Sequence, residues 1–139
     1  MKGRFGGGGG GGEERITSSF SILDPASGEI KKRVELPYPN SSGVLSTAGG
    51  LAVTGLIDGS IIAFDDQTLD VLWQINVGSG INAPPPNIYA VNGEQYIAVA
   101  SGLCCVRPSG QIANTKSRVA RTPELREMSQ ATVLYVFGL

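Results

Sequence analysis

Few residues in this sequence of 139 combine a type and a spacing that could do chemistry. There is no histidine, which removes the commonest general base, the commonest zinc ligand and every Ser-His or Cys-His nucleophile pair. Cys104 and Cys105 are adjacent, and a disulfide between neighbours needs a strained ring. We therefore favour two reduced thiols over a disulfide, and the redox state of these cysteines depends on the compartment. Asp65 and Asp66 form a pair more typical of a capped turn than of a cation site. These residue types therefore argue against a self-contained hydrolase or zinc enzyme.

The stretch GSGINAPP contains the best candidates for contact with a ligand, Ile81, Asn82 and Ala83. Glycines before them and prolines after them fix an extended turn where the backbone can approach a flat ligand closely. Asn82 offers both a donor and an acceptor. A plain connecting turn explains the same composition, and both interpretations stay open.

The elements that must position these residues are predicted to be β-strands, because the apolar pattern beyond residue 15 has a period of two. The β-rich runs are ITSSFSIL, GVLSTA, LAVTGL, SIIAFD, VLWQIN, QYIAVAS and VLYVFGL, separated by turn signals such as PASG, DG, GSG and NG. Only residues 122–129, TPELREMS, look helical, with Thr122 as the N-cap and Pro123 at the first helical position. The length allows one domain, and its fold class is all-β.

The strands repeat at an offset of 41 residues, at which Asp24 lies over Asp65, Ser27 over Thr68 and Lys32 over Trp73. That period, with four short strands per unit, is typical of β-propeller blades. A third, altered copy follows, in which 93–102 resembles 49–55 and 133–138 resembles 60–65. We expect a partial propeller of about two to three four-stranded antiparallel blades over residues 16–139, with an insertion at 103–132.

The remaining patterns exclude several partners. Residues 1–15 contain seven consecutive glycines and are predicted to be a flexible linker or loop. Eleven basic against twelve acidic residues, without a run of like charge, give no footprint for nucleic acid. The positive residues at the start are followed by no apolar region of a signal peptide, and no apolar run reaches the ~18 residues of a transmembrane segment.

The stretch Ala63 to Trp73, AFDDQTLDVLW, resembles the tryptophan docking motif of quinoprotein propellers. In that family a turn closed by Asp and Thr, with an alanine before it and a tryptophan after it, locks each blade onto its neighbour. The resemblance implies a structural docking role for Ala63, Asp65, Thr68 and Trp73, although spacing alone also fits a tryptophan in the core of one sheet. Two departures are Lys32 in place of tryptophan in the first copy and Leu69 in place of the usual glycine, which predicts a strained turn.

The resemblance extends over residues 16–102 and 120–139, which are similar in motif order to the carboxy-terminal part of the eight-bladed alcohol dehydrogenases that depend on pyrroloquinoline quinone (PQQ). It implies a periplasmic oxidoreductase that transfers hydride from a primary alcohol to PQQ beside a calcium ion, with a cytochrome c as a possible electron acceptor. In the family the catalytic aspartate, the calcium ligands and a disulfide of adjacent cysteines come from earlier blades. Ile81, Asn82 and Ala83 would line one edge of the cofactor site, and Cys104 and Cys105 do not match that disulfide.

Three hypotheses follow from this sequence. The first is the terminal propeller portion of a PQQ-dependent alcohol dehydrogenase, inactive by itself, whose partners are the remaining blades. The second is a non-catalytic propeller scaffold, against which the GSGINAPP stretch counts. The third is a truncated fragment without an independent role. Because an open arc of blades exposes unpaired sheet edges, we expect the isolated chain to be marginally stable or oligomeric.

Overall fold

The computed structural model describes residues 17–40, 42–82, 85–102 and 131–138. The described part is all-β, which confirms the predicted fold class. Its strands are β1 (Ser18–Leu23), β2 (Ile30–Leu36), β3 (Val44–Ser46), β4 (Leu51–Gly55), β5 (Ser60–Asp65), β6 (Val71–Asn76), β7 (Asn87–Val91), β8 (Glu94–Ser101) and β9 (Val133–Gly138). The predicted linker 1–15, the predicted helix 122–129, both cysteines and nearly all of the insertion 103–132 lie outside the described residues.

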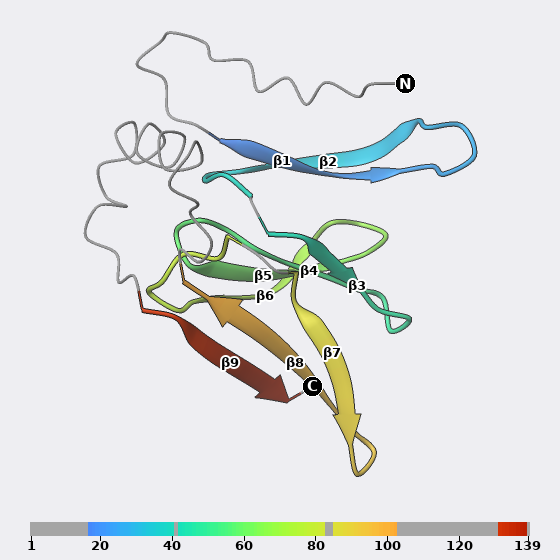
Figure 1. Cartoon of the computed structure of the whole chain (residues 1–139). Helices are drawn as coiled ribbons and strands as arrows, with labels where there is room; N and C mark the ends of the chain where they lie inside the picture. The colour runs from blue at the N-terminus through green and yellow to red at the C-terminus, as the bar shows by residue number, and fades with distance from the viewer. Residues whose placement is uncertain (1–16, 41, 83–84, 103–130, 139) are drawn as a thin grey trace, which may run out of the picture.

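The strands form three antiparallel sheets stacked in chain order (Figure 1). The first sheet has the order β1-β2, the second β3-β4-β5-β6 and the third β7-β8-β9. One unit of the predicted four strands is therefore complete within the described residues, and it is flanked by sheets of two and three strands. This stack matches a partial β-propeller, in which successive sheets pack face to face.

Period-two alternation in β5 divides the core between the two interfaces of the second sheet. Ile62 and Phe64 belong to a buried cluster that includes Leu36 of the first sheet. Ile61 and Ala63 belong to a second cluster that includes Val99 of the third sheet. Because successive side chains of a strand point to opposite faces, a central strand that is apolar throughout can serve two neighbouring sheets.

The register of the first two hairpins follows the 41-residue repeat. Phe20 lies opposite Val34 as Ile61 lies opposite Ile75, and both pairs of positions are 41 residues apart. Each hairpin also has a register shift at the corresponding place, between Ile22 and Leu23 and between Ala63 and Phe64. The two hairpins are thus structural copies of each other.

The strands β2 and β7 are absent from the runs that the sequence pattern predicts. The sequence of β2, IKKRVEL, is mostly charged and exposed, so it has little apolar alternation to detect. It is an edge strand, where lysine and arginine discourage pairing with other chains. The strand β7 follows a run of prolines and is joined to β8 by a turn at Asn92-Gly93, where both residues have positive φ, as a type I′ hairpin requires.

Candidate functional site

The turn between β5 and β6 is organised by the carboxylate of Asp65. Its Oδ1 accepts the backbone N–H groups of Gln67 (2.9 Å) and Thr68 (2.8 Å). The backbone closes the same turn twice, with Leu69 N–H donating to the Asp65 carbonyl (3.0 Å) and Asp65 N–H donating to the Asp70 carbonyl (2.9 Å). The Thr68 hydroxyl donates to Asp70 Oδ2 (2.8 Å) and accepts from the Asp70 N–H (3.2 Å). Asp65 and Thr68 are therefore used to shape the backbone.

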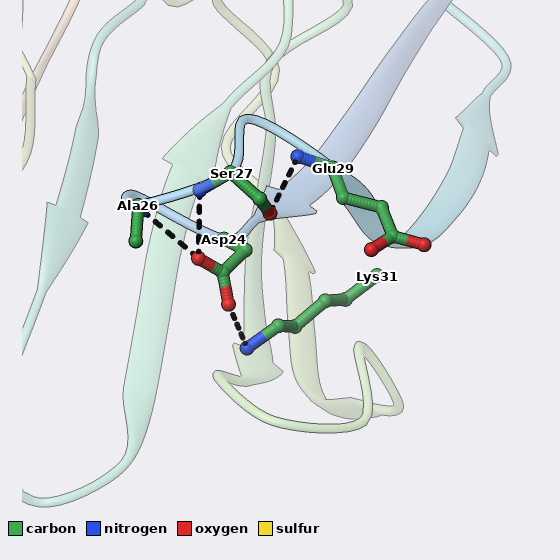
Figure 2. Close-up of polar contacts among 5 residues, drawn as sticks. All are labelled: Asp24, Ala26, Ser27, Glu29 and Lys31. Carbon is green, nitrogen blue, oxygen red and sulfur yellow. Dashed lines mark hydrogen bonds and ion pairs between the residues drawn. The ribbon is translucent and has the colours of Figure 1, made fainter.

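The turn between β1 and β2 repeats this arrangement, as Figure 2 shows. Asp24 Oδ1 accepts the N–H groups of Ala26 (2.9 Å) and Ser27 (3.2 Å), and the Ser27 hydroxyl accepts the Glu29 N–H (3.3 Å). In addition, Lys31 Nζ lies 2.8 Å from Asp24 Oδ2. An Asp with a Ser or Thr three residues later is thus the sequence signal of this turn in both copies.

Both turn carboxylates have a pKa below the usual range. For Asp24 the larger cause is the contact with Lys31, followed by the two backbone N–H groups. For Asp65 the causes are the N–H groups of Thr68 and then Gln67. Hydrogen bonds to the ionised form favour that form, so the stabilisation is present above the unfolded pKa of about 3.9 and is lost as the pH falls through the folded pKa.

We expect Asp65→Ala to lower the urea midpoint of unfolding at pH 7, because two backbone N–H groups lose their acceptor. The difference from the parent chain should narrow below a pH of about 4, where the parent carboxylate protonates. Asp66→Ala is the matched control, since the Asp66 carboxylate accepts only the Gln67 side-chain amide among the contacts described. Equal midpoints for Asp65→Ala and Asp66→Ala at pH 7 would contradict the capping role of Asp65.

Leu69 has a left-handed backbone, with φ of 56°. The equivalent residue of the first turn is Gly28, with φ of 73°, so this turn requires a left-handed residue at that position. A side chain there costs about 1–2 kcal/mol. The Leu69 side chain is 2% exposed and lies in the cluster with Ala52 and Phe64, and such burial contributes about 1.5–3 kcal/mol. The predicted strain is present, and burial between the first two sheets offsets it.

We expect Leu69→Gly to lower the free energy of unfolding by about 1–3 kcal/mol. The stability lost with the buried leucine side chain is larger than the stability gained by relieving the strained left-handed backbone. Urea denaturation followed by circular dichroism measures the difference. Gly28→Ala measures the cost of placing a side chain on this left-handed backbone without a change in packing, since no atom lies within 4 Å of its added Cβ. It should lower the free energy of unfolding by about 1 kcal/mol. A more stable Leu69→Gly chain would show that strain outweighs burial.

Trp73 lies at the boundary between the second and third sheets. It is opposite Ala63 in the β5–β6 pair, directly beside the register shift of that hairpin. Its ring meets Phe137 of β9 edge to face, with centroids 5.1 Å apart. The side chain is 39% exposed. Trp73 thus contacts a neighbouring sheet, as a docking residue must, and its role as a blade-to-blade lock remains a prediction.

The predicted ligand edge, residues 81–83, is partly used for packing. Ile81 is fully buried in the cluster between the second and third sheets, and its N–H donates to the Leu56 carbonyl (3.0 Å). It also forms a parallel bridge with Gly102. The Ile81 side chain is therefore used for packing, and contact of this edge with a cofactor remains a prediction. Asn82 is half-buried, and Ala83 lies outside the described residues.

A buried polar cluster next to this edge was not predicted from the sequence. Thr54 is fully buried; its hydroxyl accepts from Asn40 Nδ2 (3.0 Å) and donates to the Gly43 carbonyl (3.0 Å). The Ser42 hydroxyl accepts the Gly55 N–H and donates to the Gly55 carbonyl, both at 2.9 Å. These contacts attach the connection between β2 and β3 to the end of β4. Isolated Ser, Thr and Asn residues carry no pattern that would reveal such a cluster in advance.

The described residues do not fit a complete PQQ and calcium site. PQQ carries carboxylates, whereas two apolar grooves of the described part, of about 440 and 540 Å³, have no charged side chain among their lining residues. Calcium takes six to eight oxygen ligands. No group of three acidic, cysteine or histidine side chains is gathered in the described ranges. Of the two residues of the predicted edge that the structure describes, Asn82 is the one whose side chain is only half-buried.

The part of the chain that the structure describes contains no helix with the length and hydropathy needed to cross a bilayer.

Comparisons with known proteins find quinoprotein alcohol dehydrogenases among the relatives of this chain. No protein-family model matches the chain. The chain is 40% identical over 105 residues to the quinoprotein ethanol dehydrogenase of Pseudomonas aeruginosa, a match that covers 74% of this chain and 17% of that protein. It is 44% identical over 79 residues to lupanine 17-hydroxylase [cytochrome c] of a Pseudomonas species, covering 57% of this chain and 11% of the relative.

Solved structures give the same result. A europium-containing methanol dehydrogenase superposes with a TM-score of 0.70 at 30% identity, covering 87% of this chain and 23% of that one. The quinohemoprotein alcohol dehydrogenase of Comamonas testosteroni superposes with a TM-score of 0.58 at 31% identity, covering 62% and 13%. The chain spans only 11% to 18% of the length of the first three curated relatives.

Proposed function

Because this chain is homologous to one segment of the quinoprotein alcohol dehydrogenases, we propose that it forms part of the propeller wall of a PQQ-dependent alcohol dehydrogenase. The observation that supports this most directly is the agreement between that homology and the stacked sheets with their 41-residue repeat. In this role the chain packs blades against one another, and it is inactive as an isolated chain. The residues that transfer hydride and hold the metal come from other parts of the polypeptide.

The intact enzyme would carry PQQ and a metal ion, which supply the hydride acceptor and a Lewis acid when bound. Calcium is the metal that the sequence resemblance implies. One relative is named a lanthanide-dependent methanol dehydrogenase and one solved structure a europium-containing methanol dehydrogenase, so a lanthanide is a second candidate. A periplasmic location and electron transfer to a cytochrome c are part of the same proposal.

A non-catalytic propeller scaffold is the second candidate, and one structural observation removes the argument against it. The GSGINAPP stretch counts against a scaffold only if that stretch has no structural use. Ile81 is fully buried, and the Gly102 N–H donates to the Gly80 carbonyl (2.8 Å), so this stretch joins the second and third sheets. The presence of the GSGINAPP stretch is therefore compatible with both an enzyme and a scaffold.

The decisive experiment probes periplasmic and cytoplasmic fractions of the source cells with an antibody against residues 128–139. We expect a periplasmic band several times larger than 14.4 kDa that comigrates with alcohol-dependent dye reduction, and we expect the activity to be lost when PQQ is removed. A large band without such activity would favour the scaffold. A band at 14.4 kDa would overturn both candidates and favour a fragment.

A binding measurement tests whether the chain alone forms a cofactor site. Purified chain is titrated with PQQ, with calcium or europium present, while the emission of Trp73, its single tryptophan, is followed. We expect no saturable change below millimolar PQQ, because the described residues supply no complete site. Saturable micromolar binding would contradict the proposal that this chain contributes only to the wall.

A further inference from the structure

The turn between β7 and β8 contains Asn92 and Gly93, and Asn92 is the only asparagine in the sequence that is followed by glycine. Both residues are exposed and have a left-handed backbone, with φ of 53° and 86°. This conformation explains the choice of residues, because a type I′ turn favours asparagine and glycine at its two central positions. The same choice places a carboxamide carbon next to a backbone nitrogen that carries no shielding side chain.

The two groups that could react at this turn are free. Among the described residues, no hydrogen bond involves the Asn92 carboxamide or the Gly93 N–H. No atom lies within 4 Å of the position that a Cβ on Gly93 would occupy, so the space around this residue is open. The Gly93 nitrogen can therefore approach Asn92 Cγ after a rotation of the peptide between them, which glycine permits.

Two comparable places in the second sheet lack this freedom. The Asn76 carboxamide donates to the Asp58 carbonyl (3.0 Å) and accepts a backbone N–H (2.8 Å), and a β-branched valine follows it. At the Asp58-Gly59 turn, the carboxylate accepts the Ser60 N–H (3.1 Å), and the glycine N–H donates to the Leu56 carbonyl (3.1 Å). The β7–β8 turn differs from both because its carboxamide and its glycine nitrogen are unbound.

We propose that Asn92 is a site of spontaneous deamidation in the folded chain. The Gly93 backbone nitrogen loses its proton and forms a bond to Asn92 Cγ, and the Cγ–Nδ2 bond breaks to release ammonia. The product is a five-membered succinimide. Water then opens the ring at Cγ to give aspartate, or at the backbone carbonyl carbon to give isoaspartate. The overall reaction consumes one water and releases one ammonia, and it needs no oxidant or reductant.

Isoaspartate at position 92 would open the end of the β7–β8 hairpin. Its backbone contains one additional methylene, so a turn of two residues no longer joins Val91 to Glu94 in their present register. Either product also adds a carboxylate close in sequence to Glu94, whose own carboxylate accepts the Tyr96 hydroxyl (2.7 Å). Because β7 is an edge strand that pairs only with β8 in the described sheet, it should lose order first. The inference concerns this hairpin and does not rest on the proposed function.

Peptide mapping by mass spectrometry tests the proposal on the purified full chain, incubated from neutral to mildly alkaline pH. We expect the peptide that contains Asn92 to gain one mass unit, and to do so faster at higher pH because the attacking nitrogen must lose its proton. A peptide that contains Asn76 should react at least about tenfold more slowly, since that amide reacts only when its turn opens. A parallel sample in urea gives the rate of the unfolded chain, and the rate at Asn92 in the folded chain should lie within about tenfold of it.

A matched variant shows that the signal comes from this turn. Isoaspartate is identified by enzymatic methylation of its carboxylate, and the succinimide by hydroxylamine, which cleaves the chain between Asn92 and Gly93. Asn92→Gly is the control, because a Gly-Gly pair suits the same turn and has no carboxamide. It should keep the thermal transition of the parent and lose both signals. No mass gain at Asn92 in the folded chain, equal rates at Asn92 and Asn76, or signals that persist in the variant would overturn the proposal.

Hydrogen exchange measures the effect of the modification on the sheet. In the fraction that contains isoaspartate, we expect the amides of β7, Asn87–Val91, to exchange faster than in the fresh chain. Those of β5, Ser60–Asp65, should be unchanged, since that strand lies inside the second sheet. Unchanged exchange of β7 would overturn the proposed loosening of the hairpin.

Discussion

Phe64→Ala is expected to lower the free energy of unfolding of this chain by about 3–5 kcal/mol. Phe64 is 1% exposed and is the largest of the fully buried side chains in the described residues. Its ring lies against that of Phe20 in the first sheet in a tilted arrangement, with centroids 5.3 Å apart, so its loss opens the interface between two sheets. Replacing a buried phenylalanine by alanine costs about 3–5 kcal/mol, and a small domain has only about 5–15 kcal/mol in total. Urea denaturation followed by far-UV circular dichroism measures the effect.

Phe137→Ala is the matched control, because Phe137 holds the equivalent position in the third sheet but is only half-buried. Its removal should cost clearly less, since part of its ring already contacts solvent. Equal losses for the two variants would mean that the interface between the first and second sheets is no more important to stability than the interface between the second and third.

Gly55→Ala is expected to destabilise the chain by about 1–3 kcal/mol, although it adds only one methyl group. A Cβ at Gly55 would lie 2.5 Å from Ile81 Cγ2 and 2.7 Å from Ile81 Cβ, at a point where the isoleucine is fully buried. The branched side chain cannot move away without disturbing the cluster between the second and third sheets. Differential scanning calorimetry would record the loss as a lower melting temperature.

Gly49→Ala is the control for the general effect of adding a methyl group, because its added Cβ would lie in ordinary contact with Thr47 Oγ1, at 3.6 Å. It should change the melting temperature little. In the Gly55→Ala background, Ile81→Ala should cost less than it does in the parent chain, since it removes the Ile81 Cγ2 and Cδ1 atoms that would lie 2.5 and 3.0 Å from the added Cβ. A double variant whose loss equals the sum of the two single losses would refute direct contact as the cause.

The local structure of this chain follows closely from the sequence. Period-two alternation predicts most of the strands, and the Asp-x-x-Ser/Thr pattern at Asp24 and Asp65 predicts two turns that prove to have matching hydrogen bonds. The substitution of glycine by Leu69 predicts a strained turn, and a φ of 56° is found there. These features are predictable because each depends on residues a few positions apart. Charged β2 was missed because its few apolar residues show no clear alternation.

The sequence by itself determined that this protein is an all-β chain with a 41-residue repeat and related it to quinoprotein alcohol dehydrogenases. Only the tertiary structure decided that Leu69 is buried between two sheets, that Trp73 meets Phe137, and that Ile81 packs behind Gly55. The physical reason is that alternation along a strand tells which side chains share a face. It does not tell which distant sheet covers that face, because that depends on contacts between residues tens of positions apart.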